Sequence, residues 1–272
     1  EGAYLNRVLS ATFTPGSVFK TVTLAAALET IPDAESRIYH CDGSVVIGGE
    51  TIVCSGTHGD QSLSEAFAHS CNVAFGQLAA ELGGETLQRY AEKAGLTASY
   101  SVSTVDTARG RFDLTGLDEG QLAWSGVGQG NDLVNPCAMM VWMGAIANGG
   151  KAAVPYYAER TVDFLGIPHS LHHSAKTDRL VSADTAARLT ELMANNVDVT
   201  YGASRFPNMD LCAKSGTAEV GDGKGHHAWF VGFLRTEDAP CAFAVLVENG
   251  GGGSSVAGGV AAKVLDPIVN GY

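Results

Sequence analysis

The last third of the sequence differs in pattern from the rest, and this contrast restricts the possible folds more than any other feature. Three runs, at 209–220, 226–235 and 241–249, have the composition of β-strands joined by short turns that contain Gly or Asp. The residues before them show the apolar spacing and the end signals of helices. The expected helices cover residues 14–29, 62–69, 72–82, 85–94, 135–148 and 182–196, and a closing helix covers 256–269. We therefore predict an α+β fold in which helices pack against a meandering antiparallel sheet.

Length, composition and charge exclude several classes of protein. The chain has 272 residues, 45% of them hydrophobic, which suits one large domain or two closely packed ones. Its formal net charge is −12, from 17 basic and 29 acidic side chains, so a nucleic-acid backbone would be repelled. The longest apolar runs, at 138–147 and 242–247, are too short to span a bilayer. We expect no nucleic-acid partner.

The segment at 12–29 holds a hydroxyl and an amine at helical spacing. Pro15-Gly16 marks a turn, Ser17 stands where a helix could begin, and Lys20 follows one turn later on the same face. A serine hydroxyl needs a base within hydrogen-bond reach to act as a nucleophile, and a lysine can be that base when burial lowers its pKa. The pair alone is weak evidence, because a helix-capping serine followed by a solvated lysine has the same spacing.

Two further short motifs make this pair informative. Ser70–Asn72 (SCN) lies in a break between two expected helices, and Lys214–Thr217 (KSGT) lies on the first of the late strands. The patterns S-x-x-K, S-x-N and K-[ST]-G each occur once, in this order. Such a set is a signature of penicillin-binding proteins and serine β-lactamases.

The chain resembles the transpeptidase domain of class B, high-molecular-weight penicillin-binding proteins over residues 6–269. Longer segments carry the resemblance beyond the short motifs, namely TPGSVFK (14–20), GTHGDQSLSEAFAHSCN (56–72), GVGQGNDLVNPCAMM (126–140), and AKSGTAEV (213–220) with the two strands after it. The resemblance implies a β-lactamase-like fold, with a helical subdomain packed against an antiparallel sheet and flanking helices. It divides residues 1–272 into a helix-rich part at roughly 14–200 and a sheet part formed by 201–272 and the N-terminal residues.

The resemblance also assigns catalytic roles. Ser17 would attack the substrate, and Lys20 would take its proton. Ser70 would relay a proton to the leaving amine, and Asn72 would hold Lys20 and a substrate amide. Without these roles, Ser70 would be a turn hydroxyl and Asn72 the N-cap of the helix that follows it, and capping is compatible with the catalytic role.

The substrate-binding set lies on the first late strand. Lys214 would supply positive charge for the terminal carboxylate of a stem peptide that ends in D-Ala-D-Ala. Ser215 and Thr217 would bind that carboxylate through their hydroxyl groups. Gly216 would leave room for the substrate along the strand edge. Glu219 belongs to the same set.

Two backbone N–H groups and the two lysines complete the expected mechanism. The N–H of Ser17 at a helix N-terminus and, by the resemblance, the N–H of Thr217 would form the oxyanion hole. We expect Lys20 to be neutral often enough to accept the Ser17 proton, because burial and the field of Lys214 lower its pKa. We expect Lys214, facing the substrate carboxylate, to stay protonated.

The N-terminus departs from the family pattern. The family's domain begins with a two-stranded hairpin before the S-x-x-K helix, whereas only sixteen residues precede Ser17 here. We expect a fragment without this hairpin, the N-terminal pedestal and the membrane anchor. The resemblance places the protein on the outer face of the bacterial cytoplasmic membrane, with cell-division or elongation proteins as partners through the missing domains.

The expected activity is that of a D,D-transpeptidase, which cross-links peptidoglycan stem peptides through a Ser17 acyl-enzyme and is inhibited by β-lactams. A D,D-carboxypeptidase shares the first half-reaction and is poorly separated by sequence. A serine β-lactamase must hydrolyse its acyl-enzyme, but the class A signature E-x-x-L-N is not found between the second and third motifs. A non-catalytic β-lactam-sensing receptor domain would keep Ser17 acylated and carry transmembrane signalling segments, which are not found here.

Two of the six cysteines flank a predicted hairpin. Cys41 and Cys54 lie on either side of two short strands expected around Gly48-Gly49. They allow two interpretations, a disulfide across the hairpin in an oxidising compartment or two unpaired buried thiols.

Histidines cluster in the segment HSLHH. His169, His172 and His173 have no carboxylate or cysteine at ligand spacing, so we interpret them as part of a polar loop. We expect no cofactor and no metal.

Overall fold

A three-stranded antiparallel sheet forms the centre of the computed structural model, which describes residues 4–171, 175–221 and 225–271. Its strand order is β11-β10-β9, so strands that follow one another in the chain are neighbours in the sheet. The strands are β9 (Leu211–Ala218), β10 (His227–Leu234) and β11 (Cys241–Val247). The three predicted strands and their meander are confirmed.

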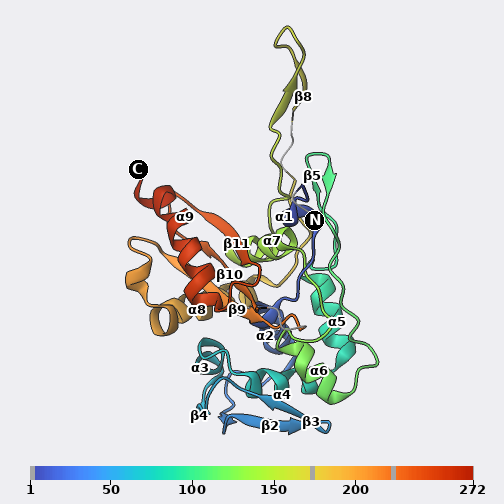
Figure 1. Cartoon of the computed structure of the whole chain (residues 1–272), viewed down its shortest axis with the longest axis vertical. Coiled ribbons are helices and arrows are strands. Elements are labelled where there is room, and N and C mark those ends of the chain that lie inside the picture. Colours follow the sequence, from blue (N-terminus) through green and yellow to red (C-terminus); the bar gives the residue numbers. More distant parts are fainter. Residues whose placement is uncertain (1–3, 172–174, 222–224, 272) are drawn as a thin grey trace.

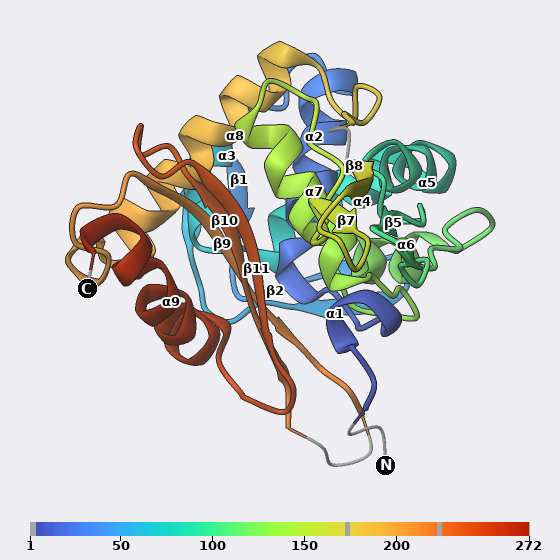
Figure 2. The ribbon, with the colours of Figure 1, turned by 90° about the horizontal axis from the view of Figure 1, so that it is seen from above.

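Helices cover both faces of this sheet (Figure 2). α9 (Gly258–Asn270) lies on one face, where its apolar side packs in a buried cluster with Phe230 of β10. α7 (Pro136–Ala147) and α8 (Ala183–Asn196) contact the sheet from the other side. α2 (Lys20–Thr30) packs against α8 and is buried along most of its length, so it forms the middle of the main hydrophobic core.

Shorter elements surround this centre. The remaining α-helices are α1 (Arg7–Ser10), α3 (Leu63–Ala68), α4 (Asn72–Leu82), α5 (Gly84–Lys93) and α6 (Glu119–Gly126). Two-stranded pairs are formed by β1 (Tyr39–Cys41) with β4 (Gly59–Gln61), β2 (Ser44–Ile47) with β3 (Glu50–Val53), β5 (Ser101–Val102) with β6 (Val105–Asp106), and β7 (Arg160–Val162) with β8 (Pro168–Leu171). Within the described ranges, no helix is both long and apolar enough to cross a membrane.

Most helix ends follow local signals in the sequence. Ser62 and Glu65 form a capping box at the start of α3. Asn135 caps α7, whose first residue is Pro136, and Ser182 caps α8. These side chains satisfy backbone N–H groups that a helix leaves unpaired in its first turn. The predicted helices at these places are therefore confirmed to within one or two residues, whereas α6 was not predicted.

The first predicted helix begins later than expected. The sequence predicted a helix over 14–29, but the structure has a 3-10 turn at Gly16–Val18 and starts α2 at Lys20. Gly16 has a φ of +57°, a left-handed conformation that cannot continue into an α-helix. Ser17 therefore lies in the turn that leads into α2 and does not cap the helix.

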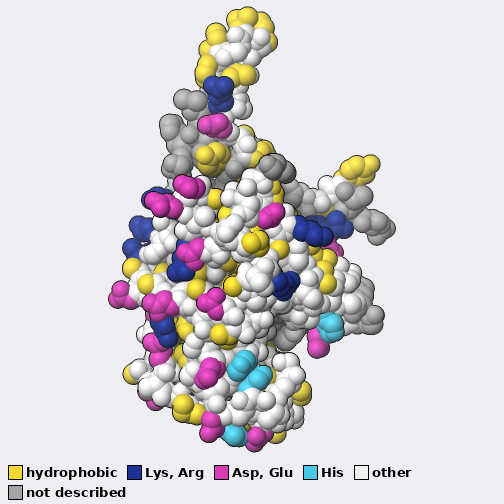
Figure 3. Space-filling model, turned by 90° about the vertical axis from the view of Figure 1, so that its left-hand side faces the viewer, with side chains coloured by type: hydrophobic (Ala, Val, Ile, Leu, Met, Phe, Trp, Pro, Cys, Tyr) yellow, Lys and Arg dark blue, Asp and Glu magenta, His cyan; other side chains and the backbone are white. Residues whose placement is uncertain are grey.

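The hairpin of β7 and β8 projects from the body of the molecule (Figure 1). Its tip exposes Phe164, Leu165 and Ile167, and hydrophobic side chains are visible there in the space-filling view (Figure 3). His169 lies in β8, and His172 and His173 lie outside the described residues.

Candidate active site

Lys20 is the first residue of α2, and its side chain is fully buried. Its Nζ lies 2.6 Å from the carbonyl oxygen of Ser70, 2.7 Å from Oδ1 of Asn72 and 3.2 Å from Oγ of Ser70. Desolvation by burial lowers the pKa of Lys20 to about 7, against the opposing charge effect of Cys54 and Cys71. A neutral amine has two hydrogens and one lone pair. The two shortest contacts can take the hydrogens, which leaves the lone pair to accept a proton.

Lys214 approaches the same hydroxyl from β9. Its buried Nζ lies 3.0 Å from Oγ of Ser70 and 2.9 Å from the carbonyl oxygen of Ser215. Burial, and then the charge of Lys20, lower the pKa of Lys214 well below its usual value. The expectation that Lys214 simply stays protonated in the free enzyme is therefore not supported. Two like-charged amines buried against one hydroxyl titrate as a unit.

Ser70 lies in the turn between α3 and α4, and Asn72 is the first residue of α4. Ser70 has a φ of +55°, which is uncommon for a residue with a side chain. Asn72 donates from Nδ2 to the carbonyl oxygen of Val53 at 2.8 Å, and this bond turns its Oδ1 toward Lys20. Cys71 occupies the N-cap position of α4, so the interpretation of Asn72 as the cap is wrong.

The turn that carries Ser17 packs closely against β9. A Cβ atom on Gly16 would lie 2.8 Å from the carbonyl oxygen of Thr217, and one on Gly216 would lie 3.0 Å from Cγ1 of Val18. Gly216 therefore permits close packing of β9 against this turn, and its role in leaving room for substrate stays a prediction. The packing brings the backbone of Ser17 beside the KSGT strand.

Ser17 lies beside the hydrogen-bonded lysine cluster. The residue is half-buried, and in the described part of the chain no hydrogen bond joins its hydroxyl to Lys20 or Ser70. The structure thus joins Lys20, Ser70, Asn72 and Lys214 by hydrogen bonds and places Ser17 on the adjacent turn. Catalytic hydrogen bonds are often long or poorly aligned in a free enzyme and shorten when substrate binds.

The outer edge of β9 has no strand partner among the described residues. The N–H of Ser215 points to this edge, because it donates to the hydroxyl of Tyr201 at 2.8 Å. Backbone N–H groups alternate in direction along a strand, so the N–H of Thr217 points the same way. The Thr217 carbonyl accepts from Nε2 of Gln129, and its hydroxyl accepts from the N–H of Gly253, both at 3.2 Å.

A cavity of about 710 Å³ lies beside this edge. Gln129 and Glu219 are among its lining residues, and both side chains are accessible there. The structure therefore places the predicted Glu219 at the cavity, near the exposed side chain of Thr217 and apart from the lysine cluster. No role was predicted for Gln129, although it lies in the GVGQG segment at 126–130, or for Tyr201, for which the sequence has no local signal.

Comparison with known proteins decides the family. Residues 1–269 match the model of the penicillin binding protein transpeptidase domain. The chain belongs to this family. The predicted resemblance is confirmed, and two curated relatives are informative about its extent. The chain is 32% identical to the peptidoglycan D,D-transpeptidase PbpA of Mycolicibacterium smegmatis, over 97% of this chain and 56% of the relative. It is 29% identical to the stage V sporulation protein D of Bacillus subtilis, over 95% of this chain and 42% of the relative.

Solved structures of transpeptidase domains have the same fold. The chain is similar to the ceftriaxone acyl-enzyme complex of penicillin-binding protein A from M. tuberculosis, with a TM-score of 0.89 and 30% identity, over 97% of this chain and 62% of that one. It is also similar to the D,D-transpeptidase domain of a peptidoglycan glycosyltransferase from Eggerthella lenta, with a TM-score of 0.88 and 28% identity, over 98% and 67%. The predicted α+β fold class is confirmed. The chain spans about half the length of the curated relatives it matches first.

Proposed function

We propose that this transpeptidase domain is the catalytic part of a serine D,D-transpeptidase that cross-links peptidoglycan and is acylated by β-lactams. The observation that carries the proposal is the placement of two buried amines, those of Lys20 and Lys214, against the single Ser70 hydroxyl beside the Ser17 turn. A base with a pKa near 7 is suited to general base catalysis at neutral pH.

In the acylation step, Oγ of Ser17 attacks the carbonyl carbon of the penultimate D-Ala and its proton passes to Nζ of Lys20. The hydroxyl of Ser70, which touches both amines, relays a proton to the departing D-Ala nitrogen. The backbone N–H groups of Ser17 and Thr217 hold the oxyanion, and loss of one such donor in a comparable site costs about 3 kcal/mol. The amine of a second stem peptide then attacks the ester and releases Ser17.

β9 binds the donor substrate. The donor peptide extends along the outer edge of the strand, with its terminal carboxylate near Lys214 and the hydroxyls of Ser215 and Thr217. An approaching carboxylate raises the pKa of Lys214, so Lys214 gains its proton when substrate binds. Glu219 and the cavity beside it contact the part of the peptide that precedes the reacting bond.

We place the whole protein at the outer face of the bacterial cytoplasmic membrane, because its proposed substrate lies there. Residues at roughly 14–200 form the helix-rich wall of the site, and 201–272 with the N-terminal residues form the sheet wall. Cell-division or elongation proteins are proposed as partners through segments outside this chain.

A fluorescent penicillin, followed over time on the parent and on Ser17→Ala, tests the proposal. We expect a covalent label that persists on the parent and is absent from Ser17→Ala. Rapid loss of the label would favour a β-lactamase and contradict the proposal. A D-Ala-D-Ala stem peptide supplied with an amine acceptor separates the remaining alternatives. A cross-linked product supports the transpeptidase, free D-Ala without it indicates a carboxypeptidase, and no D-Ala release indicates a sensor.

A further inference from the structure

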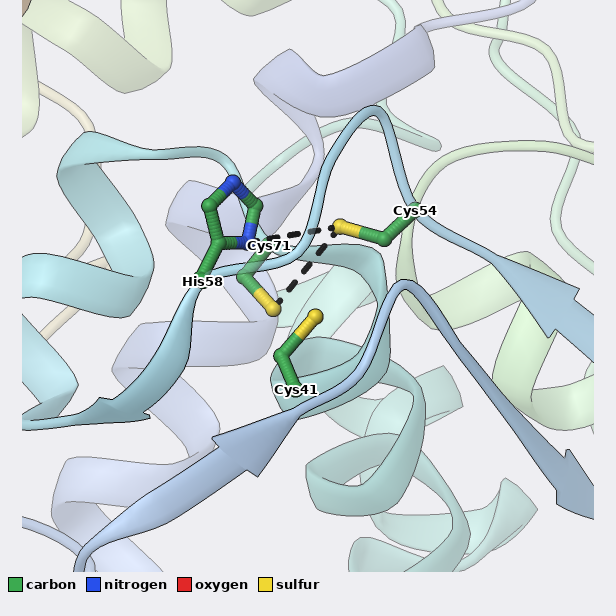
Figure 4. Close-up of side chains that lie close together, drawn as sticks. All are labelled: Cys41, Cys54, His58 and Cys71. Carbon is green, nitrogen blue, oxygen red and sulfur yellow. Dashed lines mark hydrogen bonds between the residues drawn. The ribbon is translucent and has the colours of Figure 1, made fainter.

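Three cysteines and one histidine converge directly behind the SCN turn. Cys41 ends β1, Cys54 follows β3, His58 precedes β4, and Cys71 caps α4. One ligand atom from each lies within 4.8 Å of all the others. Figure 4 shows the three sulfur atoms and the imidazole of His58 turned toward one another. From the sequence, no metal site was expected, and only the HSLHH segment was weighed as a candidate.

Two distances within this cluster match the edges of a tetrahedral metal site. Sγ of Cys54 lies 3.8 Å from Sγ of Cys71 and 3.6 Å from Nδ1 of His58. With Zn–S of about 2.3 Å and Zn–N of about 2.0 Å, a tetrahedral site has sulfurs about 3.8 Å apart and a sulfur and a nitrogen about 3.5 Å apart. A disulfide would need the sulfurs at about 2.05 Å.

The alternative of a hairpin disulfide does not describe this structure. All six cysteines are free thiols, so Cys41 and Cys54 are not bridged. Both instead face the group that contains Cys71 and His58. Three sulfurs and one imidazole form a ligand set typical of structural zinc, whereas harder cations such as Mg²⁺ and Ca²⁺ prefer oxygen ligands.

The surroundings of the cluster also suit metal ligands. The backbone N–H of Asn72 donates to Sγ of Cys54 at 3.3 Å, and that of Ala74 donates to Sγ of Cys71 at 3.5 Å. Such bonds orient the ligand atoms and favour sulfur as thiolate. The ring of His58 stacks on the ring of His69, with a distance of 4.8 Å between the ring centroids and an angle of 12° between the ring planes. This stacking limits the rotation of the His58 ring. Cys54 and His58 are only half-buried, so a metal ion can enter from their side.

We propose that Cys41, Cys54, His58 and Cys71 bind one zinc ion, and that this ion fixes the SCN turn in its catalytic position. Cys71 lies between Ser70 and Asn72, the two residues that contact Lys20. Zinc would tie Cys71 to the ends of β1 and β3, and so add to the hydrogen bonds that Asn72 makes with Val53 and Cys54. The ligands act on the reaction only by positioning this turn.

Zinc content is the direct test. The protein is incubated with equimolar zinc under reducing conditions, desalted and analysed by elemental mass spectrometry. We expect one zinc per chain in the parent and in the matched control Cys241→Ser, which changes a half-buried cysteine outside the cluster. Loss of a ligand in Cys41→Ser should weaken zinc binding at least about 100-fold, because even outer partners of ligands contribute 10–100-fold. Equal zinc contents in the parent and Cys41→Ser would overturn the site.

A measurement on the parent alone covers the case in which the variant fails to fold. Co²⁺ added to the zinc-free parent should produce the visible bands of tetrahedral cobalt and the charge-transfer absorption of thiolate ligands. Octahedral bands, or no spectrum, would contradict the proposal. A Cys54–Cys71 disulfide in protein that is fully labelled by penicillin would contradict it as well.

The positioning role has its own readout. The zinc-free parent, at a temperature where its circular dichroism is unchanged, should react with saturating penicillin at least several-fold more slowly, and added zinc should restore the rate. An unchanged rate would refute the positioning role. Because zinc content is measured without penicillin, failure of this site and failure of the proposed transpeptidase activity are distinguishable.

Discussion

Lys20 and Lys214 share one hydrogen-bond partner, the hydroxyl of Ser70, at 3.2 Å and 3.0 Å from their respective Nζ atoms. Both side chains are fully buried, and burial is the largest cause of the lowered pKa of each. Adding a second positive charge to this pair is unfavourable, because each charge is desolvated and repels the other. Ser70 is thus placed to pass a proton between the two amines.

Replacement of Lys20 by arginine separates a basic role from a merely cationic one. Lys20→Arg keeps a positive charge but cannot accept a proton near neutral pH, so the rate of penicillin acylation should fall by about 10³-fold. In the parent, that rate should rise with pH as Lys20 loses its proton, with a midpoint near its pKa of about 7. The second-order labelling rate across pH measures both. A variant that labels nearly as fast as the parent would show that Lys20 is not the base.

Replacement of Lys214 by arginine should have a milder effect. Lys214→Arg retains a cation for the substrate carboxylate, so a measurable fraction of the acylation rate should remain. Binding should weaken several-fold, because the guanidinium is larger than the ammonium in this fully buried place. The concentration dependence of penicillin labelling separates binding from chemistry. A loss as large as that of Lys20→Arg would argue against a binding role for Lys214.

Ser70 provides a test that separates backbone conformation from chemistry. Its φ of +55° is tolerated by glycine, whereas alanine in this region costs about 1 kcal/mol. Ser70→Gly should therefore be more stable than Ser70→Ala by about that amount in urea unfolding. Both lack the hydroxyl between the lysines and should acylate at least about 10²-fold more slowly than the parent. Rapid acylation of either variant would remove Ser70 from the proton path.

Gly128 supports the Ser17 turn by close approach. Gly16 donates its N–H to the carbonyl oxygen of Gly128 at 2.8 Å, and a Cβ on Gly128 would lie 1.8 Å from the carbonyl oxygen of Gly16. Gly128→Ala should therefore lose about 1–3 kcal/mol more stability than the control Gly116→Ala, since overpacking adds to the strain of a positive φ. Gly116 has a similar φ, but a Cβ there meets open space. Gly128→Ala should also slow penicillin labelling, and equal stability losses would contradict this account.

The buried carboxyl of Asp132 should make the stability of the protein depend on pH. Burial raises the pKa of its carboxyl to about 7, and its Oδ2 has no hydrogen-bond partner among the residues that the structure describes. Between about pH 4 and 7 the folded protein holds a proton that the unfolded chain releases, so the free energy of unfolding falls as pH rises through this window. Asp132→Asn removes this pH-dependent contribution of the carboxyl. The free energy of unfolding of the variant relative to the parent should therefore rise by up to about 4 kcal/mol from pH 4 to pH 8. Urea unfolding at several pH values measures this difference. If the free energies of unfolding of the parent and Asp132→Asn change with pH in parallel, the prediction is wrong.

The sequence by itself determined most of the longer helices, the three strands of the central sheet and the family. Capping residues such as Ser62, Asn135 and Ser182 act within one helical turn, and strand composition is also local, so these elements could be predicted without knowledge of the fold. The order and spacing of the three short motifs, together with the longer segments around them, were sufficient for the family. The motifs also identified the residues that form hydrogen bonds around Ser70 in the structure.

Only the tertiary structure decided how these parts act on one another. The Ser17 turn departs from the predicted helix because it packs closely against β9 and Gly128, which are distant in the sequence. The pKa of Lys214 depends on its burial and on Lys20, neither of which is visible in the KSGT motif. Among the four residues of the cysteine–histidine cluster, only Cys54 and His58 are close in the sequence, and all four meet because β1, β3, β4 and α4 pack around one point. Burial, close approach and convergence depend on long-range packing, which local sequence patterns do not encode.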